Sequence, residues 1–203
     1  MAIINQATKE LQVKIVYYGP GKGGKTTNLE QVHANVKDVK EKGKLVSLAT
    51  SSDRTLFFDF LPIEAMAIKG FKTKFQLYTV PGQVIYNTTR QLVLRGVDGI
   101  VFVADSQYDK MAENVESFQN LEENLISQKL NLAQIPYVLQ YNKRDLPNVA
   151  PVEYMEFLLN NREVQAPSFG SAAAKCEGVF ETLNMITRLL LNKFINESGR
   201  KTA

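Results

Sequence analysis

The sequence GPGKGGKT, residues 19–26, combines glycines, lysines and a hydroxyl side chain at a spacing suited to holding phosphate groups. Glycines let backbone N–H groups turn inward and approach phosphate oxygens closely. In the pattern G-x-x-x-x-G-K-T, Lys25 supplies a full positive charge and the hydroxyl of Thr26 can ligate Mg²⁺. The stretch therefore predicts a polyphosphate ligand, the simpler alternative being a glycine-rich turn that caps a strand. The residues expected to contact the ligand are Gly19, Gly21, Lys22, Gly23, Gly24, Lys25, Thr26 and Thr27.

The sequence YNKRDL supplies Asn142, Lys143 and Asp145 directly after an apolar run that predicts a strand. The Asp145 carboxylate can accept two hydrogen bonds from the N1–H and N2–H₂ groups of guanine, and adenine offers no such pair. The aliphatic stem of Lys143 can lie along the purine ring. This stretch resembles the N-K-x-D motif of the Ras-like small GTPases. Together with the phosphate-binding pattern it predicts GTP and GDP as ligands. Taken alone, the short motif also fits a polar strand-to-loop turn.

The resemblance to small GTPases implies a further contact with the base from the loop SFGSAAAKCEG, residues 168–178. In that family a triplet of the S-A-K type offers a backbone amide to the guanine oxygen. The best match here is Ala172, Ala173 and Ala174, unless the register slips by one residue to include Ser171. The alternative interpretation is a short buried strand that ends in small residues.

The sequence TVPGQ, residues 79–83, resembles the D-x-x-G-Q motif of the same family. The resemblance implies that Gly82 gives its amide to the γ-phosphate and that Gln83 orients the attacking water. Thr79 stands in place of the aspartate that supports Mg²⁺ through water, and a hydroxyl lacks that charge. We therefore expect the metal affinity, or its dependence on the γ-phosphate, to differ from the family pattern.

The stretch SSDRTLFFDFLP, residues 51–62, lies where the first switch of a small GTPase is expected. Thr55 is the candidate for the switch threonine that closes on Mg²⁺ and the γ-phosphate, and Thr26 and Thr55 are thus the two candidate metal ligands. Arg54 is the candidate for a positive charge at the transition state, or else a solvated loop arginine. The run LFFDF, expected in a loop, is either a core segment or a partner-binding surface.

The elements that must position these residues follow from the alternation of apolar, β-branched runs with segments of helical periodicity. The runs at 99–105 and 135–142 are almost continuously apolar, as in strands covered on both faces, whereas 71–80 alternates like an edge or half-exposed strand. This order predicts an α/β fold: a single P-loop GTPase domain with a mostly parallel central sheet, helices on both faces, and the ligand beyond the carboxyl ends of the strands. Strands are expected at residues 11–18, 43–50, 71–80, 99–106, 135–142 and 168–173, and helices after residue 24, at 111–128 and at 178–195.

Length and composition bound the remaining possibilities. The 203 residues suit one domain, for which we expect residues 1–195 to form the GTPase domain and 196–203 a flexible tail. The net charge of +3, from 24 basic and 21 acidic side chains, is too even to favour nucleic acid or a membrane surface. The single cysteine, Cys176, excludes an internal disulfide and favours a reducing, cytoplasmic setting. No lipidation pattern is present at the ends, so no direct membrane anchor is expected.

Over residues 10–190 the chain is similar to the bacterial Ras-like GTPases of cell polarity and gliding motility, and TVPGQ is itself a mark of that group. The resemblance implies a cycle between GDP and GTP states, with hydrolysis stimulated by an MglB-like roadblock-domain homodimer and with the catalytic arginine at Arg54. It also implies a register shift of the strand at 43–50, effectors of polarity and motility, and recruitment of the GTP state to a cell pole. Without partners a monomer is expected. Lys22, in place of a more usual residue, is expected to alter nucleotide release.

Two other functions share the phosphate-binding pattern. A P-loop nucleotide phosphotransferase would need an acceptor site and an arginine-rich lid, and the basic residues of this chain are scattered. A scaffold that binds GTP without hydrolysing it would have no use for Gln83. The sequence therefore favours the hydrolysing switch over both.

Overall fold

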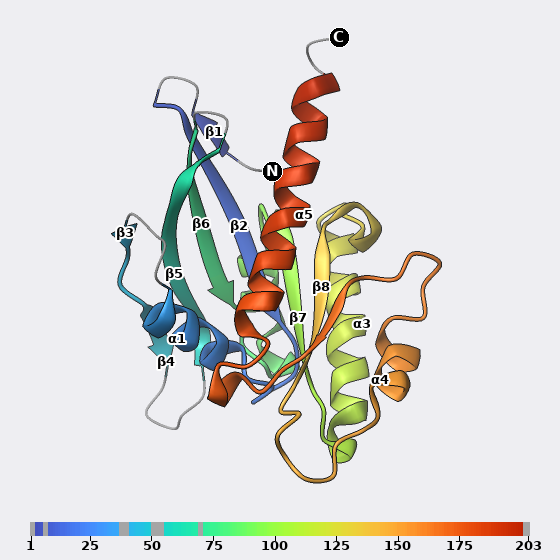
Figure 1. The fold of residues 1–203 in the computed structure, drawn as a ribbon. Coiled ribbons are helices and arrows are strands. Elements are labelled where there is room, and N and C mark those ends of the chain that lie inside the picture. Colours follow the sequence, from blue (N-terminus) through green and yellow to red (C-terminus); the bar gives the residue numbers. More distant parts are fainter. Residues whose placement is uncertain (1–2, 6–7, 37–40, 50–54, 69–70, 201–203) are drawn as a thin grey trace.

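The computed structural model describes residues 3–5, 8–36, 41–49, 55–68 and 71–200, which are built around one β-sheet (Figure 1). Nine strands of the described residues form it, in the order β3-β5-β6-β2-β7-β8-β9, with β1 on β2 and β4 on β5. The strands are β1 (Ile3–Asn5), β2 (Glu10–Tyr18), β3 (Glu41–Lys42), β4 (Val46–Ala49), β5 (Thr55–Ile68), β6 (Phe71–Thr79), β7 (Gly99–Asp105), β8 (Tyr137–Asn142) and β9 (Ser168–Gly170).

The centre of the sheet is parallel. β2 pairs in parallel with β6 on one side and with β7 on the other, and β8 and β9 continue the parallel order. β5 runs antiparallel to β6, and β1, β3 and β4 also pair antiparallel. All residues of β7 are buried, as its continuous apolar sequence predicts. The predicted α/β class with a mostly parallel sheet is confirmed.

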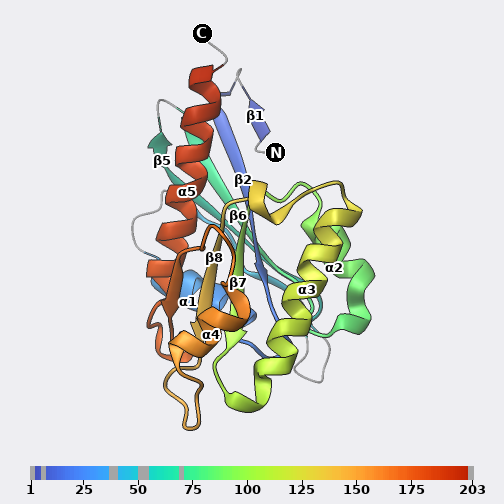
Figure 2. The same ribbon diagram turned by 90° about the vertical axis from the view of Figure 1, so that its right-hand side faces the viewer.

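Helices cover both faces of this sheet (Figure 2). One core cluster joins the sheet to α2, α3 and α4 and includes Phe102, Leu121 and Met155. The other joins the sheet to α1 and α5 and includes Leu29 and Ile186. Burial of apolar side chains on both sides fixes the sheet in place. The helices are α1 (Lys25–Asn35), α2 (Asn87–Leu94), α3 (Met111–Ser127), α4 (Val152–Leu159) and α5 (Val179–Arg200).

The segment that we expected as a switch loop is largely a strand. The run LFFDF belongs to the 14-residue strand β5, which pairs with β6 so that Leu61 lies opposite Leu77. Leu61 and Ile63 are buried, so alternate apolar side chains of this strand enter the core. The loop assignment is wrong because a strand of this length can satisfy its backbone on β6 while burying one face.

Strand β6 was expected at an edge or half-exposed, and only the second alternative holds. It lies between β5 and β2. Its alternation arises because Phe75 and Leu77 are buried while Lys74 and Gln76 point outward and bond to side chains of β2, Glu10 and Gln12. An interior strand with one polar face gives the same sequence pattern as an edge strand.

The ends of several elements differ from the expected bounds. β4 occupies only Val46–Ala49 of the strand expected at 43–50, and β9 ends at Gly170 because a 3₁₀ turn, Ala173–Lys175, follows. α5 continues to Arg200, past residue 196, where the tail was expected to begin. None of the helices in the described part of the chain has the length and apolar character needed to cross a bilayer.

Candidate nucleotide-binding site

The phosphate-binding loop joins β2 to α1 at the carboxyl edge of the parallel strands (Figure 1). Gly19 and Gly24 have φ angles of +140° and +101°, which residues with a side chain rarely adopt. A Cβ at Gly19 would lie 2.2 Å from the carbonyl oxygen of Val103, and one at Gly24 would lie 2.1 Å from Nδ2 of Asn142. Both glycines are therefore required by close contacts with β7 and β8 as well as by the turn. The side chain of Lys22 is exposed, at a φ of +58°.

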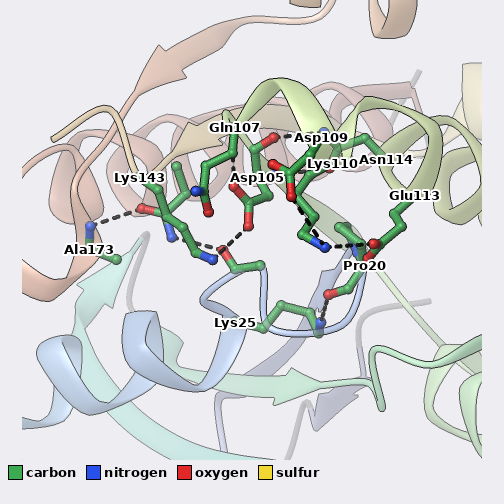
Figure 3. A network of polar contacts seen from close by, with 12 residues as sticks. Pro20, Lys25, Asp105, Gln107, Asp109, Lys110, Glu113, Asn114, Lys143 and Ala173 are labelled. Carbon is green, nitrogen blue, oxygen red and sulfur yellow. Dashed lines mark hydrogen bonds and ion pairs between the residues drawn. The ribbon is translucent and has the colours of Figure 1, made fainter. Parts of the chain in front are cut away.

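The start of α1 offers donors for an anion. Gly24 is the N-cap and no side chain caps the helix, so the N–H groups of its first turn remain available to a ligand. Lys25 begins the helix and is only 6% exposed. Its Nζ donates to the carbonyl oxygens of Gly19 at 3.0 Å and Pro20 at 2.6 Å, so it lies against the loop that it is expected to serve (Figure 3).

Burial lowers the pKa of Lys25 to about 7, the positive charge of Arg90 adds to this effect, and Asp59 opposes it. In the unfolded chain the lysine pKa is near 10.5, so between pH 7 and 10.5 the unfolded chain holds a proton that the folded chain lacks. Stability rises with pH wherever the unfolded state binds more protons. In this window Lys25 therefore makes the nucleotide-free protein more stable as the pH rises.

We expect the free energy of unfolding of nucleotide-free protein to increase from pH 7 to pH 9, by at most about 1.4 kcal/mol per pH unit from this lysine. Urea titrations of wild type and Lys25→Met at each pH measure the effect. Lys25→Met should show a flatter profile, and the exposed Lys44→Met should follow wild type. Parallel profiles for wild type and Lys25→Met would contradict the prediction.

Asn142, at the end of β8, connects the phosphate-binding loop to the loop expected to meet the base. Its Nδ2 donates to the carbonyl oxygen of Gly23 at 2.8 Å. Its Oδ1 accepts from the Ser171 hydroxyl at 3.0 Å and from the Ala173 amide at 2.9 Å. Asn142 is 2% exposed and all these bonds are buried. One amide side chain therefore sets the distance between the two loops.

Lys143 and Asp145 lie on the same edge as Asn142. Lys143 has a φ of +67°, and its Nζ donates to the buried carboxylate of Asp105, at the end of β7, at 2.6 Å (Figure 3). This ion pair holds the loop after β8 against β7. The side chain of Asp145 is 18% exposed, and its carboxylate lies 3.4 Å from the more exposed side chain of Lys175. Its carboxylate is thus partly exposed at this edge of the sheet.

The loop with Gly82 and Gln83 lies directly on the phosphate-binding loop. A Cβ at Gly82 would lie 2.4 Å from Cα of Gly21 and 2.8 Å from the carbonyl oxygen of Pro20. A Cβ at Gly21 would lie 3.8 Å from Cγ of Gln83. The structure therefore brings together the residues predicted to sense the γ-phosphate and those predicted to bind the phosphates.

A carboxylate that the sequence pattern did not reveal lies beside Thr26. Asp59, on β5, is fully buried, and its Oδ2 accepts from the hydroxyls of Thr26 at 2.6 Å and Thr79 at 2.9 Å. The Asp59 amide donates to the Thr79 hydroxyl at 2.8 Å. The motif lacks an aspartate at position 79, but the opposite strand supplies a carboxylate next to Thr79. A carboxylate therefore lies beside Thr79, although Thr79 itself carries no charge. The expected difference in metal affinity stays a prediction.

The two predicted switch residues are Arg54 and Thr55. Thr55 begins β5, four residues before Asp59, which is about 13 Å along an extended strand. The metal-binding role of Thr55 stays a prediction. Arg54 lies outside the described residues.

Sequence reasoning missed Asp59 and Asp105 as site residues. Each is an acidic residue next to or within an apolar run, which is a signal of a buried carboxylate with a specific partner. Of the residues expected to meet the base, Ala173 donates its amide to Asn142. Ala172, the preceding residue, is buried. In the register that is shifted by one residue to include Ser171, the Ser171 hydroxyl also donates to Asn142.

Comparison with known proteins agrees with this arrangement. The profile of the ADP-ribosylation factor family matches residues 1–190. The chain belongs to the ADP-ribosylation factor family of small GTPases. As a member of this family it binds guanine nucleotides and hydrolyses GTP. It is 53% identical over 193 residues, 95% of this chain and 97% of the relative, to the mutual gliding-motility protein MglA of Myxococcus xanthus (strain DK1622). It is 26% identical over 178 residues, 88% of this chain and 97% of the relative, to the uncharacterized protein MJ1339 of Methanocaldococcus jannaschii.

The residues of this GTPase fit the magnesium ion that its family usually uses. Thr26 and Asp59 offer hard oxygen donors beside the phosphate-binding loop. Within the described ranges no group of three or more His, Cys, Asp or Glu side chains could hold a metal. Mg²⁺ keeps several waters and binds through one or two protein oxygens together with substrate phosphates, and Thr26 and Asp59 can supply such oxygens.

Proposed function

We propose that this GTPase is a Mg²⁺-dependent switch that cycles between GDP and GTP states and controls cell polarity or motility. The observation that carries the switch is the contact of Gly82 and Gln83 with the phosphate-binding loop, because a loop so placed responds to the terminal phosphate. The biological role rests on the 53% identity to a gliding-motility protein.

The expected roles of the site residues follow from their positions. The N–H groups of residues 19–25 and the Lys25 ammonium bind the phosphates, and Asp145 accepts from guanine. Gly82 donates its amide to the γ-phosphate. Gln83 orients the water that attacks the γ-phosphorus, and Arg54 adds positive charge in the transition state. Bound Mg²⁺ supplies charge neutralisation on the β- and γ-phosphate oxygens.

Loss of the γ-phosphate removes the ligand of Gly82 and releases its loop. The surface of this loop changes on hydrolysis, and a regulator would bind to that surface. By its similarity to MglA, we propose an MglB-like roadblock-domain homodimer as the activator, polarity and motility effectors as further partners, and recruitment of the GTP state from the cytoplasm to a cell pole. Without these partners we propose a monomer.

The test is nucleotide binding and single-turnover hydrolysis with purified protein. Tight binding of GDP and GTP but not of ADP and ATP, followed by slow release of phosphate from GTP, would support the proposal. Acceleration by the roadblock partner from the same organism would support the regulated cycle. Transfer of the γ-phosphate to a small acceptor would favour a phosphotransferase instead. GTP that stays intact with every candidate activator would favour a non-hydrolysing scaffold.

The role of Asp59 gives a separate prediction for the metal. Asp59→Asn keeps the shape and an acceptor for Thr26 and Thr79 but removes the charge. We expect it to weaken the dependence of GDP release on Mg²⁺ by about tenfold, in the range found for residues that support metal ligands. The measurement is the ratio of GDP release rates in EDTA and in excess Mg²⁺. Asp109→Asn, whose side chain is 67% exposed, is the control. An unchanged ratio in Asp59→Asn would show that another group supports the metal.

A further inference from the structure

Arg90, on α2, is a fully buried arginine whose hydrogen-bond partners in the described structure are all uncharged oxygens. Burying a charge is costly unless it is well hydrogen-bonded, so such a residue calls for a specific reason. Its Nε donates to the carbonyl oxygen of Pro81 at 2.9 Å, and its Nη2 donates to the carbonyl oxygen of Gly82. One guanidinium thus holds two consecutive carbonyls of the loop that lies on the phosphate-binding loop.

Because of the geometry of the peptide bond, these two contacts also fix the direction of the N–H groups of Gly82 and Gln83. The carbonyl of Pro81 and the N–H of Gly82 belong to one peptide plane, and the carbonyl of Gly82 shares a plane with the N–H of Gln83. The described chain contains no cis peptide bonds, and in a trans peptide the carbonyl and the N–H point in opposite directions. Fixing both carbonyls on the Arg90 side therefore aims both N–H groups away from it. Gly82 packs on Gly21 of the phosphate-binding loop.

The remaining nitrogen of Arg90 anchors the guanidinium to the body of the protein. Nη1 donates to Oδ1 of Asn120, on α3, at 2.7 Å and to the Tyr18 hydroxyl at 3.3 Å. Tyr18 is the last residue of β2, directly before the phosphate-binding loop, and its hydroxyl donates to the same Oδ1 at 2.7 Å. Asn124 donates to the Tyr18 hydroxyl at 3.0 Å and to the side chain of Asn87 at 2.7 Å. The guanidinium is therefore held from α3 and β2 while it holds the loop.

We propose that Arg90 is a positioning residue for GTP recognition and hydrolysis, because it orients the Gly82 and Gln83 peptide planes toward the terminal phosphate. This inference rests on the proposed role of Gly82 as the sensor of that phosphate. Two features of arginine explain the choice of residue. Its planar fork can reach two consecutive carbonyls at once, which a lysine ammonium cannot do in the same fixed geometry. A donor on each carbonyl also polarises the peptide and strengthens its N–H as a donor.

The proposal predicts that a change at Arg90 weakens the binding of a triphosphate more than that of a diphosphate. Arg90→Lys keeps the charge but loses the fork, so the affinity for a non-hydrolysable GTP analogue should fall by about tenfold or more, the effect of losing one hydrogen bond to a charged oxygen. The affinity for GDP, which has no γ-phosphate, should change little. Single-turnover hydrolysis should slow by at least the same factor. Isothermal calorimetry with GDP and with the analogue, both in excess Mg²⁺, measures the affinity ratio.

A matched control distinguishes positioning from general packing. Gln91→Ala removes a bond from the same network, between Gln91 and Asn124 at 3.0 Å, without touching the loop of Gly82. It should leave the ratio of the two affinities as in wild type. Asn120→Ala, which removes the anchor of the guanidinium, should shift the ratio in the same direction as Arg90→Lys, and it keeps the test open if Arg90→Lys does not fold.

Three outcomes would count against the proposal in different ways. If Arg90→Lys bound GDP and the GTP analogue more weakly by the same factor, and the protein also lost stability, Arg90 would only support packing. An unchanged ratio and a wild-type hydrolysis rate in a folded variant would also overturn the inference. If wild type bound neither nucleotide, the proposed function itself would fail.

Discussion

Replacement of Arg54 by alanine is expected to lower the partner-stimulated rate of single-turnover GTP hydrolysis by about 10³-fold or more, the contribution that a catalytic arginine makes in related reactions. Negative charge develops on the oxygens around the γ-phosphorus in the transition state. Lys22, Lys25 and Lys143 are already assigned to the phosphates and the base, so Arg54 is the cation predicted for this role. β5 begins at Thr55, about 13 Å along the strand from Asp59 beside Thr26. We propose that the partner braces the segment that carries Arg54 and so brings its charge to the γ-phosphate.

The comparison needs wild type and Arg54→Ala, each with and without the roadblock partner. Arg95→Ala, which removes an exposed arginine at the end of α2, is the matched control and should keep the stimulated rate. If Arg54→Ala remained within a few fold of wild type in the presence of the partner, the arginine would have to come from elsewhere. If the partner accelerated neither protein, the proposed activator would be the wrong one.

Gly24→Ala is expected to weaken the binding of GDP and GTP by about 100-fold or more, the equivalent of losing two hydrogen bonds to charged oxygens. The new Cβ would lie 2.1 Å from Nδ2 of Asn142, so Asn142 or the loop must move. Asn142 holds Gly23 of the phosphate-binding loop and Ala173 of the loop expected to meet the base. One methyl group therefore disturbs both halves of the site.

Gly96→Ala separates this steric effect from backbone strain. Gly96 also has a positive φ, +68°, but a Cβ there would meet nothing within 4 Å. It should cost about 1–2 kcal/mol of stability from the left-handed conformation alone and leave nucleotide affinity unchanged. Fluorescent-nucleotide titration and urea unfolding of both variants decide the matter. Similar affinity losses in the two variants would show that strain, rather than the contact with Asn142, is responsible.

Much of the site could be predicted from the sequence because its chemistry is local. The residues from Gly19 to Thr26 depend on a spacing that a strand, a turn and a helix impose within one short stretch, and the same holds for Asn142 to Asp145. The apolar runs of β7 and β8 likewise predict buried parallel strands without knowledge of their neighbours. The roles of Arg54 and Thr55 came from the family resemblance alone, and they stay proposals.

The sequence by itself determined the ligand class, the α/β fold and the residues nearest to the phosphates and the base. The tertiary structure alone decided which distant side chains complete the site. Asp59 reaches Thr26 only because β5 pairs antiparallel with β6 and places Asp59 beside Thr79, and a strand register is a relation between segments that no single segment records. Arg90 looks like an ordinary helix arginine in the sequence. Its burial and its hydrogen bonds to the carbonyls of Pro81 and Gly82 arise from the packing of α2 against α3, because the positions of buried partners are set by the whole core.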